Sequence, residues 1–397
     1  MALNRRLISH TLALIPLISI ANTFLLFALL IKPFSEPSSW SLACWTAEWF
    51  WRYMQNHWEI NLNAGPVIYV TGDPLPYQES AIVISNHLSF SDYYLVQHLA
   101  VKAGMLGRCR YFAKKELVRI PIFGWAFWAI GMILVSRNWT DDASSIQAAF
   151  SRIKHNAHDV WIVLYPEGTR RTPRKVLASQ VYARQNDKRP LDHLLQPRTK
   201  GFVATIQGKL ILPLSVVGLI QRRILLLGQD MKIDEIPAFS FVVDDDSWSG
   251  LHDSHVRYVY DMTTRYVSPH GDVVPSLGEL LGCADLARAG YEFHVHVRRI
   301  PIEDLPMDEV GLKRWCEKTW EYKDEMLGNM LRAEKYSRKG FADGHGHDHS
   351  HGHDSARHPL PYGSMDGKEG GNDNDIWVRS GNEDEDVDGH RRSDSRL

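Results

Sequence analysis

The 25 residues from Leu7 to Ile31 are almost all apolar, and they constrain the chain more than any other segment. A helix rises about 1.5 Å per residue, so this stretch would be about 37 Å long, enough to cross a bilayer with some tilt. It is longer than the core of a usual signal peptide and lacks a clear small-residue cleavage site. We therefore expect an uncleaved membrane helix, with a cleaved signal peptide as the alternative.

The next segment, Ser39 to Trp58, mixes many aromatic side chains with a few polar and charged ones. This composition is typical of a helix that lies in the headgroup region of a membrane. The alternative is a helix that packs against the folded domain. We expect residues 1–60 to form a membrane anchor with an interfacial helix, as a single spanning helix or as a helical hairpin.

Apolar runs alternate with amphipathic stretches through residues 61–335, which we expect to form the main domain. Such alternation predicts an α/β fold, and we expect a mixed sheet with flanking helices. Helices are expected at Asp92 to about Ala103, Asp141 to Asn156, and Gly311 to Arg332. Strands are expected at Ala81–Ser85, Arg110–Ala113, Ile130–Val135, Val160–Tyr165, Lys209–Val217, Val256–Tyr260 and Tyr291–Arg299.

The composition changes over residues 336–397, where Gly, Asp, His, Ser and Arg dominate and apolar residues almost vanish. A segment of this kind cannot bury enough surface to offset its ordering entropy, so we expect a disordered tail. The run from His345 to His353 could bind a soft divalent metal. Without a fixed geometry, incidental binding is the preferred interpretation, and no metal site is predicted.

A histidine and an aspartate, His87 and Asp92, follow the strand expected at Ala81–Ser85. Five residues on a helix correspond to roughly 500°, so the two side chains would point about 140° apart there. A turn between a strand and a helix can instead bring them together, with Ser91 as a possible helix cap. A carboxylate beside an imidazole fixes its tautomer and stabilises the imidazolium, which is the arrangement of a general base.

Further short blocks follow this one in a fixed order. They are Phe112–Leu117, Ile120–Trp125, Ser136–Arg137, Tyr165–Arg170 and Ile211–Leu214. Over residues 81–217 the series resembles the glycerolipid acyltransferase family, which includes the 1-acylglycerol-3-phosphate acyltransferases. The stretch Phe293–Arg299, with Trp315 to Asp324 after it, is similar to the branch that contains lysocardiolipin and lysophosphatidylinositol acyltransferases, and extends the resemblance to about residue 327.

The resemblance implies a role for each block. His87 would be the catalytic base, oriented by Asp92, and Pro213 belongs to the family's fourth motif. Lys114 and Lys115 would lie beside the pocket as possible phosphate or CoA contacts. Acceptor binding is implied for Arg137, Glu167, Gly168, Thr169 and Arg170. Guanidinium groups suit phosphate oxygens, although without the resemblance each arginine would be read as a surface or ion-pair residue.

The aromatic-rich segment 121–132 could line an acyl passage, or it could be plain core. The four cysteines show no paired or metal-ligand spacing, so we expect free buried thiols in a reducing compartment. The net charge is −2, which gives no overall field that would favour nucleic acid. No Gly-x-Ser-x-Gly elbow surrounds Ser89 or Ser91, which argues against a serine hydrolase.

The sequence therefore predicts a membrane enzyme, most simply of the endoplasmic reticulum, that transfers a fatty acyl chain from acyl-CoA to a lysophospholipid or lysophosphatidic acid. Acyl-CoA would be a co-substrate, and no cofactor is expected. A CoA-independent phospholipid transacylase would use the same His-x4-Asp chemistry and is the alternative enzyme. The non-enzyme alternative is a membrane protein that binds metal through its His-rich tail.

Overall fold

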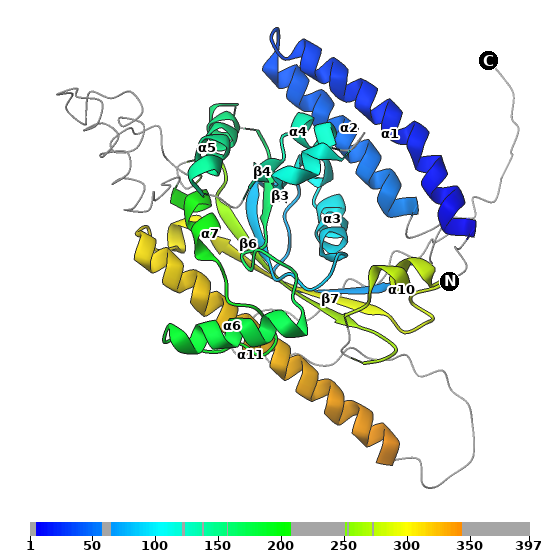
Figure 1. Cartoon of the computed structure of the whole chain (residues 1–397), viewed down its shortest axis with the longest axis vertical. Coiled ribbons are helices and arrows are strands. Elements are labelled where there is room, and N and C mark those ends of the chain that lie inside the picture. Colours follow the sequence, from blue (N-terminus) through cyan, green and yellow to red (C-terminus); the bar gives the residue numbers. More distant parts are fainter. Residues whose placement is uncertain are drawn as a thin grey trace, which may run out of the picture.

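The computed structural model describes residues 5–57, 65–120, 124–136, 139–156, 158–207, 251, 254–271 and 274–343. Its centre is a mixed sheet of seven strands in the order β1-β7-β6-β2-β5-β3-β4 (Figure 1). Neighbouring strands run parallel except β6 and β7, which are antiparallel. The strands are β1 (Val67–Gly72), β2 (Ala81–Ser85), β3 (Cys109–Lys114), β4 (Ile133–Val135), β5 (Trp161–Leu164), β6 (Tyr258–Val267) and β7 (Glu292–Pro301).

Helices cover both faces of the sheet (Figure 1). The α-helices are α1 (Arg5–Ile31), α2 (Glu36–Asn56), α3 (Asp92–Lys102), α4 (Gly124–Ala129), α5 (Trp139–Asn156), α6 (Pro173–Gln185), α7 (Thr199–Gln207), α10 (Leu277–Gly282) and α11 (Glu309–Asp343). The described residues also include the 3-10 helices η2 (Leu106–Arg108), η3 (Lys115–Arg119) and η7 (Ile302–Asp304). This architecture confirms the predicted α/β class with a mixed sheet.

The central strand β2 explains why the sheet has two covered faces. Its five residues are fully buried, as expected of a parallel strand with helices on both sides. Ile82 and Ile84 point into one apolar core, with side chains of α5, α7 and α11. Ala81 and Val83 point into the other, with side chains of α3 and α10. The parallel strands β2, β3, β4, β5 and β6 all end at the same edge of the sheet.

The N-terminal helices α1 and α2 pack side by side at one edge of the molecule (Figure 1). Small side chains make the contact close: Ala28 of α1 is buried in one cluster with Ala43 and Ala47 of α2. The outward face of α1 remains apolar and exposed. It carries Ile15, Ile20, Leu26, Phe27 and Leu30, each 46–59% exposed.

Helix α2 is also tied to the main domain, chiefly through the buried Arg110 at the start of β3. Its guanidinium donates to the backbone oxygens of Gly107 and Cys109 and to the sulfur of Cys44. It also lies 4.3 Å from the ring centroid of Trp40. The predicted Trp-rich helix therefore exists and packs on the domain, which was one of its two interpretations.

Several expectations need correction. Ile130 to Met132 precede β4 rather than extending it. Strand β6 continues seven residues beyond the end predicted at Tyr260, since its whole length pairs with β7. Ser91 occupies the N-cap of α3, but its side chain makes no capping bond. Cys283 is only half-buried, whereas the other three free cysteines are buried. Helix α11 continues to Asp343, past the end predicted at Arg332 and into the first residues of the predicted tail. The strand predicted at 209–217, the His-rich run and the rest of the tail lie outside the described residues.

Candidate active site

The His87 loop, residues 86–91, follows β2 at the edge where the parallel strands end. Asn86 is its first residue, and its side-chain amide forms hydrogen bonds with the backbone of the neighbouring strand β6. Its amide donates to the backbone oxygen of Thr264 on β6 at 2.9 Å and accepts from the Thr264 N–H at 2.8 Å. Because Asn86 is fully buried, these bonds hold the start of the loop firmly against the sheet.

The predicted pairing of His87 with Asp92 is present. Nδ1 of His87 lies 2.7 Å from Oδ2 of Asp92. A carboxylate accepts, so Nδ1 carries the proton and Nε2 is the nitrogen left to take a proton from another group. One face of the imidazole stacks on Tyr165, with ring centroids 4.4 Å apart. The His87 side chain keeps 24% exposure, so the ring is accessible although it is fixed.

Asp92 is buried and receives donors besides the histidine. The backbone N–H groups of Leu88 and Ser89 donate to it at 2.8 and 3.0 Å. The hydroxyl of Tyr266, on β6, donates to Oδ1 at 2.6 Å. Burial holds the pKa of Tyr266 well above its usual value, so this hydroxyl remains a donor. The carboxylate is therefore locked in orientation from several sides.

A second loop, the β5 turn at residues 165–171, follows the neighbouring strand β5 at the same edge. Gly168 has φ +66°, a left-handed backbone that suits glycine, and its N–H donates to Tyr165 O at 2.8 Å. Glu167 is only 1% exposed. Burial raises its pKa to about 8, so the neutral acid and the carboxylate are both populated close to neutral pH.

The two loops are joined through the backbone of His87. Its N–H donates to Oε1 of Glu167 at 3.2 Å, and its carbonyl oxygen accepts from the N–H of Arg171 at 2.7 Å. The same Glu167 oxygen receives the indole N–H of Trp320, from α11, at 3.4 Å. The position of the histidine thus depends on the β5 turn.

Cationic side chains gather at the β5 turn, but some are committed to protein atoms. Lys175 donates to the Thr169 hydroxyl at 2.6 Å and to Arg170 O at 3.1 Å. Arg171 donates through Nη2 to Asp192 O at 3.2 Å. Arg170 is exposed, and no ion pair of its guanidinium is seen among the described residues. It is therefore available to an anionic ligand.

Of the remaining predicted residues, two lie at the same edge of the sheet and two are not described by the structure. Lys114 ends β3 and Lys115 begins η3, at the same edge of the sheet, and both are exposed. Arg137 and Pro213 lie outside the described residues. In the described ranges no three His, Cys, Asp or Glu side chains lie together as metal ligands would.

Sequence reasoning missed the residues that hold these loops from a distance. Tyr266 and Trp320 lie 174 and 153 residues from their carboxylate partners. Arg198 precedes α7, and its backbone N–H donates to Pro166 O at 2.7 Å. Trp320 lay within the stretch that supported the family resemblance, which was the only available signal. Nothing in the sequence marks Tyr266 or Arg198.

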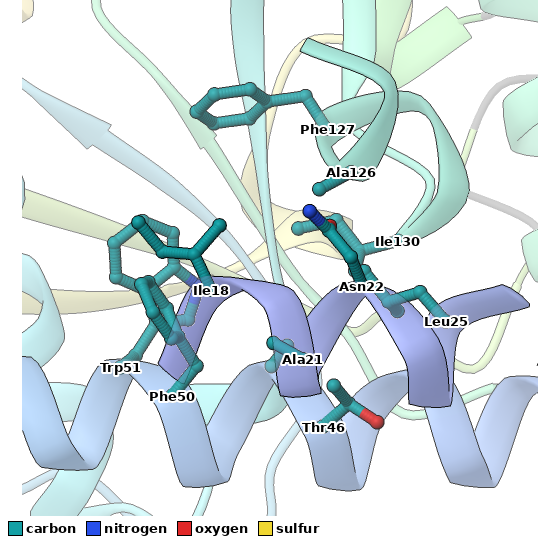
Figure 2. Close-up of a pocket in the computed structure, with 11 residues that line it drawn as sticks. Ile18, Ala21, Asn22, Leu25, Thr46, Phe50, Trp51, Ala126, Phe127 and Ile130 are labelled. Carbon is teal, nitrogen blue, oxygen red and sulfur yellow. The ribbon is translucent and has the colours of Figure 1, made fainter. Parts of the chain in front are cut away.

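An apolar pocket lies between α1, α2 and α4, with about 450 Å³ of space that is partly open to solvent. Figure 2 shows side chains of all three helices around it, including Leu25, Phe50 and Phe127. Ala126, Phe127 and Ile130 also pack into the adjoining apolar core. Segment 124–132 therefore contributes to the core and to the wall of the pocket, and its role in lining an acyl passage stays a prediction.

Comparison with known proteins gives matches over both the sheet and α11. Residues 67–206 match the family model described as Acyltransferase, and residues 286–360 match the one described as Acyltransferase C-terminus. The probable 1-acyl-sn-glycerol-3-phosphate acyltransferase 5 of Arabidopsis thaliana is 26% identical over 346 residues, which cover 84% of this chain and 76% of that protein.

Two animal proteins are similar to comparable extents. The 1-acyl-sn-glycerol-3-phosphate acyltransferase gamma of Mus musculus is 28% identical, over 67% of this chain and 56% of its own length. The 1-acyl-sn-glycerol-3-phosphate acyltransferase delta of Homo sapiens is 26% identical, over 81% of this chain and 70% of its own length. The crystal structure of the 1-acyl-sn-glycerophosphate (LPA) acyltransferase PlsC from Thermotoga maritima matches with 12% identity and a TM-score of 0.39, covering 81% of this chain and 94% of that one. On the strength of the family models and these sequence relatives, the chain belongs to the glycerolipid acyltransferase family and is an acyltransferase.

Proposed function

We propose that the protein transfers a fatty acyl chain from acyl-CoA to the free hydroxyl of lysophosphatidic acid, in phospholipid synthesis or remodelling at a membrane. The observation that carries this proposal is the 2.7 Å contact between His87 Nδ1 and Asp92, beside a turn that presents Arg170. The names of the relatives supply the acceptor, since each contains 1-acyl-sn-glycerol-3-phosphate.

In this mechanism Nε2 of His87 takes the proton of the acceptor hydroxyl as its oxygen attacks the thioester carbonyl carbon. The tetrahedral intermediate then collapses, the C–S bond breaks, and the imidazolium returns its proton to the leaving thiolate. Asp92 stabilises the imidazolium through the Nδ1 contact. No enzyme nucleophile is required, because the acceptor's own hydroxyl attacks.

The phosphate of the acceptor would lie at the β5 turn, against Arg170 and the half-buried Gly168 and Thr169. Arg137, which follows β4 by two residues in the sequence, is proposed as a second guanidinium for the same group. Glu167 supports this turn from beneath rather than meeting the ligand, since it is buried. Lys114 and Lys115 would meet phosphate groups of CoA at the rim.

The proposal also places the enzyme in a membrane. Within the described part of the chain, α1 is the one helix long and apolar enough to cross a bilayer. Its exposed apolar face needs an apolar environment, and lipid supplies one. The pocket between α1, α2 and α4 would then offer a place for an acyl chain that arrives from the bilayer. The endoplasmic reticulum is the proposed membrane, with the domain that carries the free cysteines on its reducing, cytosolic side.

The deciding experiment on the reaction is a donor and acceptor panel with the purified full chain. One acyl-CoA is offered with lysophosphatidic acid and with lysophospholipids of several head groups, and a diacyl phospholipid replaces the acyl-CoA in parallel. We expect transfer to lysophosphatidic acid from acyl-CoA. Transfer only to a lysophospholipid would overturn the acceptor, and transfer only from the phospholipid would favour a transacylase.

The membrane assignment is tested with charges on the outer face of α1. The double variant Leu26→Lys, Leu30→Lys should lower the fraction that sediments with membranes and resists carbonate. Leu177→Lys, on an exposed position of α6, is the matched control and should leave that fraction unchanged. Equal retention of both variants would show that α1 does not attach the protein.

A further inference from the structure

One exposed guanidinium, that of Arg198, lies directly over the β5 turn. A Cβ placed on Gly168 would be 3.2 Å from Cδ and 4.0 Å from Cζ of Arg198. The absence of a side chain at residue 168 therefore leaves room for this arginine as well as allowing the left-handed backbone. Arg198 and Arg170 are both exposed and both belong to the neighbourhood of Gly168.

The position of Arg198 is fixed from both sides. Its own N–H donates to Pro166 O at 2.7 Å, within the β5 turn. The segment before it is held by α11, because Asp324 accepts the N–H groups of His193 and Leu194 at 2.7 and 3.1 Å. Because these bonds already fix the backbone that carries Arg198, ligand binding costs little further backbone entropy.

Several neighbouring cations have protein partners, whereas none is seen for the Arg198 guanidinium in the described ranges. Lys188 pairs with Glu317 at 2.6 Å, and Arg189 pairs with Glu325. Lys175 and Arg171 are bound to atoms of the turn and of residue 192. For the guanidinium groups of Arg170 and Arg198, no protein acceptor is seen in the part of the chain that the structure describes.

We propose that Arg198 is an acceptor-binding residue that grips the phosphate of the lysolipid together with Arg170. This inference rests on the proposed function and deepens it. Two guanidinium forks at the same turn can satisfy more phosphate oxygens than one, which favours a phosphomonoester dianion over a phosphodiester head group.

The test uses the full chain and the variants Arg198→Ala, Arg198→Lys and Arg184→Ala. Arg184 is exposed at the far end of α6 from the turn and serves as the matched control. Acceptor and donor KM are measured with lysophosphatidic acid and acyl-CoA. Calorimetric binding of a short-chain, water-soluble lysophosphatidic acid without donor is measured in parallel.

Arg198→Ala should raise the acceptor KM and the calorimetric Kd by about tenfold or more, with the donor KM unchanged. For Arg198→Lys, both constants should lie between those of Arg198→Ala and those of the unsubstituted enzyme, since lysine keeps the charge but lacks the guanidinium fork. For Arg184→Ala, both constants should equal those of the unsubstituted enzyme. An unchanged acceptor KM in a folded, active Arg198→Ala protein would overturn the inference alone. If the unsubstituted chain binds lysophosphatidic acid through Arg198 but transfers no acyl group to it, the proposed function fails while this inference stands.

Discussion

The His87 loop and the β5 turn meet at one edge of the sheet, but they are held in different ways. In the His87 loop, Asp92 receives most of its donors from residues three to five positions away. The β5 turn instead depends on distant segments: Trp320 of α11 donates to Glu167, and Arg198 donates to Pro166. The contacts of Asp92 are therefore mostly local, whereas the β5 turn is held by segments far from it in the sequence.

This difference separates the expected effects of substitutions. Changes within the His87–Asp92 pair should act on proton transfer and hence on kcat. Changes at the β5 turn or in its supports should act on the acceptor KM, because that turn is proposed to hold the acceptor. Since Glu167 and Arg171 bond to the backbone of His87, large disturbances of the turn should reach both parameters.

The largest expected effect below His87 itself is that of Asp92→Asn. The side-chain amide carries an NH2 group, which cannot accept the hydrogen bonds that the carboxylate accepts. The substitution would also favour the wrong tautomer of His87. We expect kcat to fall by at least about a hundredfold with little change in the acceptor KM. Steady-state kinetics together with a thermal unfolding scan will check this. A rise in KM at constant kcat would break the division between the two loops.

Arg170→Ala should come next, with an effect on the other parameter. Loss of one charge-assisted contact to a phosphate should raise the acceptor KM by about tenfold or more and leave the acyl-CoA KM unchanged. Kinetics with each substrate varied in turn will show it. A rise confined to the donor KM would move Arg170 from the acceptor to the CoA side of the site.

The family and the local chemistry of the site could be predicted from the sequence because they depend on residues that are close in the chain. The His87–Asp92 pairing follows from a strand, a turn and a helix within about twenty residues. The same holds for the strand Ala81–Ser85, whose continuous apolar run marks it as buried. The narrower resemblance of residues 293–299 to lysocardiolipin and lysophosphatidylinositol acyltransferases stays a prediction.

The supports of the site could not be predicted, because they depend on the order of strands and on long-range packing. Tyr266 reaches Asp92 only because β6 lies beside β2 in the sheet, and β6 itself was predicted at half its length. Trp320 reaches Glu167 only because α11 covers the face of the sheet that also carries α7. No local spacing encodes either contact.

Trp320→Phe should have a smaller effect, through Glu167. The lost indole N–H stabilised the carboxylate, so the pKa of Glu167, already raised to about 8 by burial, should rise further. We expect a several-fold increase in acceptor KM and an upward shift of the corresponding pKa in the pH profile of kcat/KM.

The matched control is Trp315→Phe, which loses an indole on the same helix that stacks on Phe202 rather than contacting Glu167. It should change stability without moving the pH profile. Identical profiles for the two variants would show that Trp320 is only a packing residue.

The smallest effect is expected from Tyr266→Phe, which removes one of several donors to Asp92 while keeping the buried ring. A single hydrogen bond contributes about 1 kcal/mol, so kcat should fall by roughly two- to tenfold. Because His87, Leu88 and Ser89 still hold the carboxylate, the loss should stay well below that of Asp92→Asn. Equal losses in the two variants would mean that Tyr266, rather than the local loop, positions Asp92.

The most direct test that the His87 loop governs kcat and the β5 turn governs the acceptor KM is the kinetics of His87→Ala. The purified full chain is assayed with lysophosphatidic acid in vesicles and acyl-CoA in solution. A positioned base contributes about 10²–10⁴ in rate. We therefore predict that kcat falls at least about a hundredfold while the acceptor KM and the melting temperature change little. Near-normal kcat in a folded His87→Ala protein would contradict the assignment of His87 as the base.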